Sequence, residues 1–238
     1  MSAALFVCAA CAAKERCNTE VKLLLSPVEI PAIVRTLKAQ KESSLNVYFF
    51  DTERRELLAQ GVIVRLRSGS TRDLTVKLRP PQQKKFEDPA NGTEKFKCEV
   101  DLTAQESIVS YSISNSFTGL QIPETGNDIY RALSEGQRKL LSAAQVNIDW
   151  NQVNRVADIQ VTDWQIKLDS QSEKLILELW EWSGGQILEL STRTAIEPAS
   201  AAYAELRQFA SGKGLKLSAD QRSKTRVVLE SHATSIAH

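Results

Sequence analysis

Charged and polar side chains recur two residues apart on several short, otherwise apolar segments of this chain. The recurring sets are Glu20/Lys22, Arg65/Arg67, Thr75/Lys77, Glu99/Asp101 and Glu189/Ser191/Arg193. Residues i and i+2 of a β-strand point to the same face of a sheet, so each segment turns its charges one way and its Val, Leu or Ile residues the other. If such faces converge, they enclose a water-filled pocket with both signs of charge, which suits a polyanion and a divalent metal ion.

An antiparallel sheet with one solvated face shows the same alternation, and for any single segment this is the commoner origin. The crowding of positive charge argues against it here. Arg65, Arg67, Lys77 and Arg79 fall in one short stretch that has the form of a hairpin. Like charges that face each other across a hairpin destabilise it, so this basic hairpin indicates a binding site for an anion.

The composition limits the chemistry that the chain can perform. Its 238 residues suffice for one large domain with a buried core. The formal net charge is only +1, so sequence-independent binding of nucleic acid is not favoured. The two histidines, His232 and His238, lie at the end of the chain, which argues against histidine triads and histidine-ligated zinc. Proton transfer or metal binding would therefore rest on carboxylates, lysines and arginines.

The four cysteines do not form a recognisable framework. Cys8 and Cys11 lack the second ligand pair of a zinc knuckle. Cys98 falls on the strand face opposite Glu99, which predicts a small core residue rather than a disulfide. This usage favours a reducing compartment and hence a cytoplasmic location.

Residues 1–17 contain an apolar stretch that is too short to span a membrane and has no basic residue before it. We expect these residues to be a disordered or artefactual lead-in, with an export signal as the lesser alternative. No membrane partner is expected.

The remaining chain reads as a mostly antiparallel β protein with a few helices. Strands are predicted at 19–25, 45–51, 61–67, 74–80, 94–102, 153–169, 173–182 and 185–194. Helices are predicted at 30–40, 52–60, 127–145, 198–214 and from 218 onward. The Ser-rich residues 103–127 stay unassigned. Eight strands are enough to close a barrel, and no linker or repeat is visible, so we expect one domain over 18–231 and a tail over 232–238.

Six stretches of the chain form a series of motifs: Asn18-Thr-Glu20-Val-Lys22, YFFDTERRELLAQGVIVRLR, LTVKLRP, FKCEVD, LELWEWSGGQILELSTRT and QRSKTR. In this order they resemble the CYTH family, also called triphosphate tunnel metalloenzymes, and a bacterial branch of it, over most of residues 20–226. The resemblance implies an α+β, mostly β fold: an eight-stranded antiparallel closed β-barrel, or tunnel, with flanking helices. It also implies activity on tripolyphosphate or nucleoside triphosphates with Mg²⁺ or Mn²⁺.

The resemblance implies a role for each matching residue. The phosphate-binding set would be Lys22, Arg65, Arg67, Lys77, Arg155, Arg193 and Lys224. The metal ligands would be Glu20, Glu178 and Glu189, and Lys22 and Glu99 would take part in catalysis, with Glu99 orienting a basic side chain or a water. Arginine and lysine neutralise a triphosphate without a general acid, and a hard divalent ion needs few protein carboxylates because phosphates and water complete its shell.

Several of these residues have ordinary alternatives. Arg65, Arg67 and Lys77 would be solvent-exposed in a simple hairpin, Glu178 lies between two leucines and would face outward in a shifted strand, and Lys224 would be a plain helical lysine. Two departures also bear on the metal. Asn18 and Ser191 stand where the family has acids, which lowers the expected metal affinity, and residues 110–117 lack a basic side chain that the family has.

The sequence therefore predicts a divalent-metal-dependent hydrolase of tripolyphosphate or a nucleoside triphosphate, whose partner is that small molecule. Three alternatives stay open: an adenylate cyclase-type lyase on the same fold, a non-catalytic polyphosphate- or nucleotide-binding module, and a plain structural barrel.

Overall fold

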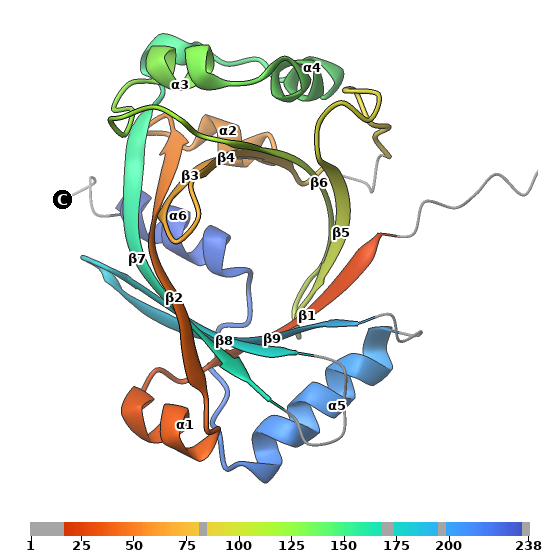
Figure 1. The fold of residues 1–238 in the computed structure, drawn as a ribbon, viewed down its shortest axis with the longest axis vertical. Helices are drawn as coiled ribbons and strands as arrows, with labels where there is room; N and C mark the ends of the chain where they lie inside the picture. Colours follow the sequence, from red (N-terminus) through yellow and green to blue (C-terminus); the bar gives the residue numbers. More distant parts are fainter. Residues whose placement is uncertain (1–16, 81–84, 168–173, 195–198, 235–238) are drawn as a thin grey trace, which may run out of the picture.

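The structure is a computed structural model that describes residues 17–80, 85–167, 174–194 and 199–234. Its main feature is a closed barrel of nine strands within these residues, in the order β1-β5-β6-β4-β3-β2-β7-β8-β9 (Figure 1). The strands are β1 (Asn18–Leu25), β2 (Gln40–Asp51), β3 (Val62–Gly69), β4 (Asp73–Leu78), β5 (Phe96–Leu102), β6 (Ser107–Ser116), β7 (Asn154–Ile166), β8 (Leu175–Trp182) and β9 (Gly185–Thr194).

The ninth strand, β6, corrects the predicted count of eight. It lies in the Ser-rich segment that had no assignment. Ser112 and Ser114 line the barrel interior, whereas Tyr111 and Ile113 are buried on the outside. The period of two is thus present, but small hydroxyl side chains on the inner face made it hard to recognise.

The barrel is also mixed rather than antiparallel. β1 pairs antiparallel with β9 on one side and parallel with β5 on the other, with Asn18 opposite Glu99. The other neighbouring pairs in the barrel are antiparallel. The parallel β1–β5 pair closes the barrel.

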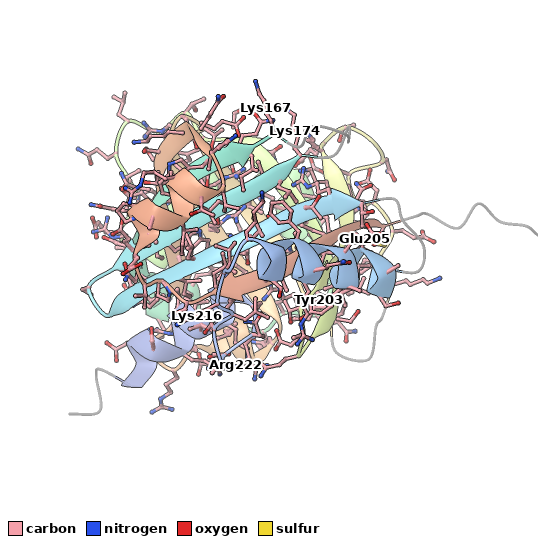
Figure 2. All side chains as sticks on the ribbon, turned by 90° about the horizontal axis from the view of Figure 1, so that it is seen from below. Lys167, Lys174, Tyr203, Glu205, Lys216 and Arg222 are labelled. Atoms are coloured by element: carbon pink, nitrogen blue, oxygen red, sulfur yellow. A yellow bond between two sulfur atoms is a disulfide. The ribbon has the colours of Figure 1, made fainter. Side chains whose placement is uncertain are left out.

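Most helices pack on the outside of the barrel (Figure 1). They are α1 (Ile30–Thr36), α2 (Glu56–Ala59), α3 (Gly126–Ala132), α4 (Glu135–Ala143), α5 (Ala199–Gly212) and α6 (Lys224–Thr234). The predicted helix over 127–145 is two helices, because Ser134 and Gln137 form a capping box that starts α4. In the view of Figure 2, α5 lies across the outer face of the barrel with Tyr203 and Glu205 on it.

Three hydrophobic clusters hold these layers together. One packs α3 and α4 onto the outer faces of β3, β4 and β6. A second packs α1 and α5 onto β1, β8 and β9. The third lies inside the barrel, where Val228 and Leu229 of α6 are buried among Phe49, Ile63 and Trp180. Because α6 is part of an interior cluster, it closes one end of the tunnel.

A disulfide joins Cys17 to Cys98, with the Cα atoms 4.6 Å apart. This overturns the interpretation of Cys98 as an unpaired core residue. Cys17 directly precedes β1 and Cys98 lies on β5, where Asn18 pairs with Glu99, so the bond links the strand pair that closes the barrel. The expected lead-in over 1–17 otherwise lies outside the described residues. Of the expected tail, residues 232–234 end α6 and 235–238 lie outside.

We expect Cys98→Ser to lower the free energy of unfolding by about 2–3 kcal/mol, because the disulfide limits the unfolded chain across a long loop. The sequence separation of the two cysteines is 81 residues. Urea unfolding of the variant and of the oxidised and reduced protein measures this. The reduced protein should unfold like the variant; equal midpoints for the oxidised and reduced protein would contradict the prediction.

Among the described helices, none has the length and apolar character needed to cross a membrane.

Candidate functional site

Inward-facing side chains from the strands, with residues of α6, line a cavity of about 620 Å³ inside the barrel. The charged residues of its lining are Glu20, Lys22, Arg65, Arg67, Lys77, Arg79, Lys97, Glu99, Asp163, Lys174, Glu178, Glu189, Arg193 and Lys224. Every predicted site residue except Arg155 is among them. Lys174, at the start of β8, lies beside the end of β7 near Lys167 (Figure 2). The alternation in the sequence thus places the charges in one enclosed space.

Arg155 lies on the outer face of the barrel, which corrects its predicted role. β7 pairs Ala157 with Phe49 and then Arg155 with Phe50, so an irregularity at Val156 shifts the register. Such a bulge turns the following side chain to the opposite face. Arg155 stacks over the ring of Tyr48 at 5.5 Å and forms an ion pair with Glu124 at 3.1 Å. It therefore does not face the tunnel.

Asp101 lies at the centre of a group of three tunnel cations, Lys22, Lys77 and Arg79, and is only 1% exposed. Its Oδ1 accepts a hydrogen bond from Lys22 Nζ at 2.7 Å, and its Oδ2 accepts bonds from Lys77 Nζ at 3.1 Å and Arg79 Nη2 at 3.4 Å. Burial alone would raise the pKa of Asp101, but the charges of these three cations outweigh it and hold the pKa well below its usual range. One buried carboxylate thus orients three cations.

Lys22 and Lys77 differ in how fully their charge is balanced. Burial opposes the charge of Lys22, yet Asp101, Glu20 and Glu189 raise its pKa above the usual value. Lys22 is therefore a permanent cation and not a general base. Burial lowers the pKa of Lys77, and the attraction of Asp101 does not make up for it because Lys22 and Arg79 add repulsion. An anion bound near Lys77 would relieve this repulsion.

Arg65 is the least balanced cation of the tunnel. It makes no hydrogen bond or ion pair with any residue that the structure describes, and its Nε is buried without a partner there. Burial and the neighbouring charge of Arg67 lower the pKa of Arg65. Arg67, by contrast, donates to Asp73 Oδ2 from Nε at 2.9 Å. A guanidinium whose Nε is buried without a partner is costly unless a ligand supplies the missing acceptor.

Glu178 and Glu189 form the acidic part of the tunnel with Lys224 between them. The two glutamates face each other across β8 and β9. Lys224 Nζ donates to Glu178 Oε1 and, at 2.8 Å, to Glu189 Oε1, and it lies 4.8 Å from the centre of the Trp180 ring. Both glutamates face inward and Lys224 is not an ordinary surface lysine, so the outward alternatives for Glu178 and Lys224 are wrong.

Asp163 on β7 lies directly opposite Glu178 and adds a third carboxyl group. Burial and the charge of Glu178 raise the pKa of Asp163 to about 6. Burial also opposes ionisation of Glu178, but the charge and hydrogen bond of Lys224 lower the pKa of Glu178 to about 2. Asp163 Oδ2 accepts a hydrogen bond from Ser43 at 2.8 Å, whereas its buried Oδ1 has no partner among the described residues.

These oxygens fit a hard divalent cation in ligand chemistry. In the described part of the chain, however, no three such side chains are already arranged around one point as metal ligands. Lys224 Nζ takes the position between Glu178 and Glu189. Glu20 lies apart from both: it pairs in register with Arg193, four residues along β9 from Glu189, and Ser191 fills the inward position between. The loss of an acid at Ser191 therefore separates Glu20 from the other two predicted ligands.

Five charged residues of the site had no role assigned from the sequence: Asp101, Arg79, Asp163, Lys97 and Lys174. Asp101 and Arg79 follow Glu99 and Lys77 at a spacing of two, so the alternation alone was enough to place them on the inner face. Lys97 faces Ser112 across β5 and β6 and brings a positive charge to the area where residues 110–117 offer none. For Asp163, the only indication in the sequence was its position on the inward-facing side of the predicted strand.

Two solved structures share this tunnel fold. One is a proposed adenylyl cyclase from Hippeastrum, described as having a dominant triphosphatase activity; it is 17% identical, with 89% of this chain and 94% of that chain covered and a TM-score of 0.59. The other is a proposed adenylate cyclase from Bacillus halodurans, 12% identical, with 89% and 97% covered and a TM-score of 0.59. No protein-family model and no curated protein matches the chain. The prediction of a closed, mostly β barrel with flanking helices is thereby confirmed.

Proposed function

We propose that this protein hydrolyses inorganic tripolyphosphate or a nucleoside triphosphate inside the tunnel, with a divalent cation, Mg²⁺ or Mn²⁺. The observation that carries the proposal is Arg65, a half-buried arginine of the cavity whose buried Nε has no partner among the described residues. The neighbouring Lys77 shares Asp101 with Lys22 and Arg79, and burial together with the repulsion of these two cations lowers its pKa. A triphosphate supplies the missing charge, and arginine binds its oxygens in a fork geometry.

In the proposed reaction, the side chains bind and orient the substrate. Lys22, Arg65, Arg67 and Lys77 contact phosphate oxygens and offset the charge that grows as the terminal phosphoryl group leaves. Asp101 fixes the directions of Lys22 and Lys77 before the substrate arrives, so little reorganisation is needed. Because Lys22 stays protonated, its catalytic role is electrostatic. Glu99, 3.5 Å from Lys77, acts on that lysine rather than on the substrate.

The carboxylates of Glu178 and Glu189, together with that of Asp163, would hold the divalent cation. Glu20 lies farther along the sheet, beside Arg193 near the C-terminal end of β9. A bound Mg²⁺ or Mn²⁺ polarises a phosphoryl oxygen and lowers the pKa of a coordinated water. Asp163 lies opposite Glu178 and Glu178 opposite Glu189, and the buried Oδ1 of Asp163 has no partner among the described residues, which supports this placement. Lys224 must turn away from the carboxylates or share them when the cation binds.

Phosphate release from tripolyphosphate and from ATP, with and without Mg²⁺ or Mn²⁺, tests the proposal. We expect metal-dependent release that falls about 100-fold in Lys77→Ala, the effect typical of removing one transition-state contact. Arg155→Ala removes a positive charge outside the tunnel and is the matched control; its turnover should stay within about twofold. Absence of release from both substrates would contradict the proposal, and retained tripolyphosphate binding would then identify a non-catalytic binding module.

A second candidate is adenylate cyclase activity, favoured by the descriptions of both structures that share the fold. The same assay separates the two reactions. A cyclase converts ATP to cyclic AMP and pyrophosphate and leaves tripolyphosphate untouched, whereas the proposed hydrolase releases orthophosphate from tripolyphosphate, from ATP or from both.

The expected cytoplasmic location stays a prediction, and the Cys17–Cys98 disulfide argues against it because such bonds are rare in reducing compartments.

A further inference from the structure

A second pocket, of about 700 Å³, lies between α2 and α6, next to the closed end of the tunnel. Its charged lining is strongly basic, with four arginines and one acid: Arg54, Arg55, Arg79, Arg226 and Glu230. The predicted phosphate-binding residues do not line it, and none of the roles described above accounts for its charge.

Arg55 provides a fixed positive charge at this pocket. It is buried, and its guanidinium donates to the carbonyl oxygens of Leu229 at 3.0 Å and Thr52 at 2.9 Å. It has no carboxylate within ion-pair distance among the described residues, because the nearby Asp51 accepts from the backbone N–H groups of Thr52, Leu57 and Leu58 instead. Burial lowers the pKa of Arg55. No carboxylate among the described residues therefore balances the charge of Arg55 at ion-pair distance.

Arg79 connects the pocket with the tunnel. Arg79, Ile63 and Ser223 line both cavities. Its Nη1 donates to Ser223 Oγ at 2.9 Å and its Nη2 to Asp101 at 3.4 Å, while its buried Nε has no partner in the described structure. The guanidinium therefore stands between the two spaces, and part of its donor capacity is unused.

The two remaining arginines lie at the rim. Arg226 is half exposed and forms ion pairs with Glu230 at 2.8 Å and Glu106 at 3.3 Å. Arg54 is exposed and has no ion pair with a described residue. Arg226 is balanced by its acids and Arg79 shares Asp101 with two lysines, but Arg54 and Arg55 have no ion pair with a described residue, so the pocket presents net positive charge to an anion.

We propose that this pocket is a second binding site for inorganic phosphate, separate from the tunnel and adjoining it at Arg79. Planar guanidinium groups from two sides match the oxygens of a phosphate group. The site itself goes beyond the proposed function; only the source of the phosphate rests on that function. The phosphate is either the orthophosphate released in the tunnel or the far end of a polyphosphate longer than the tunnel holds.

Titration calorimetry with orthophosphate tests the site in Arg65→Ala/Lys77→Ala, which weakens the binding of phosphate in the tunnel so that the second site can be observed. We expect this variant to retain one orthophosphate site, and we expect the further changes Arg54→Ala/Arg226→Ala to weaken it by about tenfold or more. The matched control is Arg35→Ala/Arg207→Ala, which removes two exposed arginines from α1 and α5 on the other side of the barrel (Figure 1). If the tunnel variant binds no orthophosphate, or if both double changes weaken it equally, the proposal is wrong.

Two further titrations, with long-chain polyphosphate and with tripolyphosphate, distinguish the two sources of the bound phosphate. They use Arg54→Ala/Arg226→Ala, in which the tunnel residues are unchanged. If the pocket holds the end of a long chain, affinity for long-chain polyphosphate falls and affinity for tripolyphosphate does not. If the pocket takes the released product, both affinities are unchanged and orthophosphate binding alone weakens. Either pattern supports the site. If this variant loses affinity for tripolyphosphate instead, the pocket belongs to the tunnel, and the proposal of a separate site is overturned whether or not the protein hydrolyses anything.

Discussion

Replacing Asp101 with asparagine is expected to lower the free energy of unfolding by about 3–5 kcal/mol near neutral pH, the cost of removing one partner from a buried ion pair. The change leaves Lys22, Lys77 and Arg79 buried around a neutral amide that cannot balance them. Urea unfolding of the two proteins measures the difference. Tripolyphosphate should recover more stability in the variant than in the original protein, because the anion replaces the lost charge.

The pH dependence of this loss has a defined sign. The folded-state pKa of Asp101 is depressed, so its stabilisation is present above the unfolded value of about 3.9 and is lost only as the pH falls through the lower folded value. The gap between the two proteins should therefore persist from neutral pH to about pH 4 and close only in stronger acid. Asp220→Asn, which breaks the exposed pair with Arg222, is the control and should cost less than about 1 kcal/mol. Equal losses in the two variants would contradict a buried charge network.

Asp101 also illustrates what the sequence determines about the site. Strand alternation is local, and it correctly turned Lys22, Arg65, Lys77, Glu99 and Glu189 to one face. Which inner residues meet depends on register and on the order of strands around the barrel, and both are set by pairings between distant segments. Asp101 meets Lys22 because β5 lies beside β1, a parallel neighbour that no turn signal indicates.

The errors in the predicted fold have similarly specific origins. The family resemblance implies a tunnel role for Arg155, but a single irregularity in β7 turns its side chain to the outer face. β6 was overlooked because its inner face carries serines, which are typical of loops as well as of a water-filled interior. Cys17 and Cys98 are far apart in sequence, and only the closing of the barrel between β1 and β5 brings them within bonding distance.

Replacing Lys224 with methionine is expected to make the stability of the protein dependent on a divalent cation. Without the ammonium group, Glu178, Glu189 and Asp163 repel one another in a buried space, and the loss should reach about 3–5 kcal/mol near neutral pH. Mn²⁺ should then raise the melting temperature of the variant more than that of the original protein, because the ion takes the position between the carboxylates. This readout needs no turnover.

In the same variant, the stability contribution of the carboxylates should depend on pH in the opposite direction from that of a carboxylate paired with a cation. In the original protein, Lys224 lowers the pKa of Glu178. In the variant, which lacks this charge, burial and mutual repulsion should raise the pKa values of Glu178, Glu189 and Asp163. An acid whose folded pKa is raised contributes stability below its unfolded pKa, about 4, and loses it as the pH rises through the folded value. The deficit of Lys224→Met should thus be small in mild acid and full at neutral pH. Lys139→Met, which removes an exposed lysine paired with Glu135, is the control and should respond to neither pH nor Mn²⁺. If the stability deficit of Lys224→Met depends on neither pH nor Mn²⁺, Lys224 stabilises α6 by packing alone, and Glu178, Glu189 and Asp163 do not form a cation site.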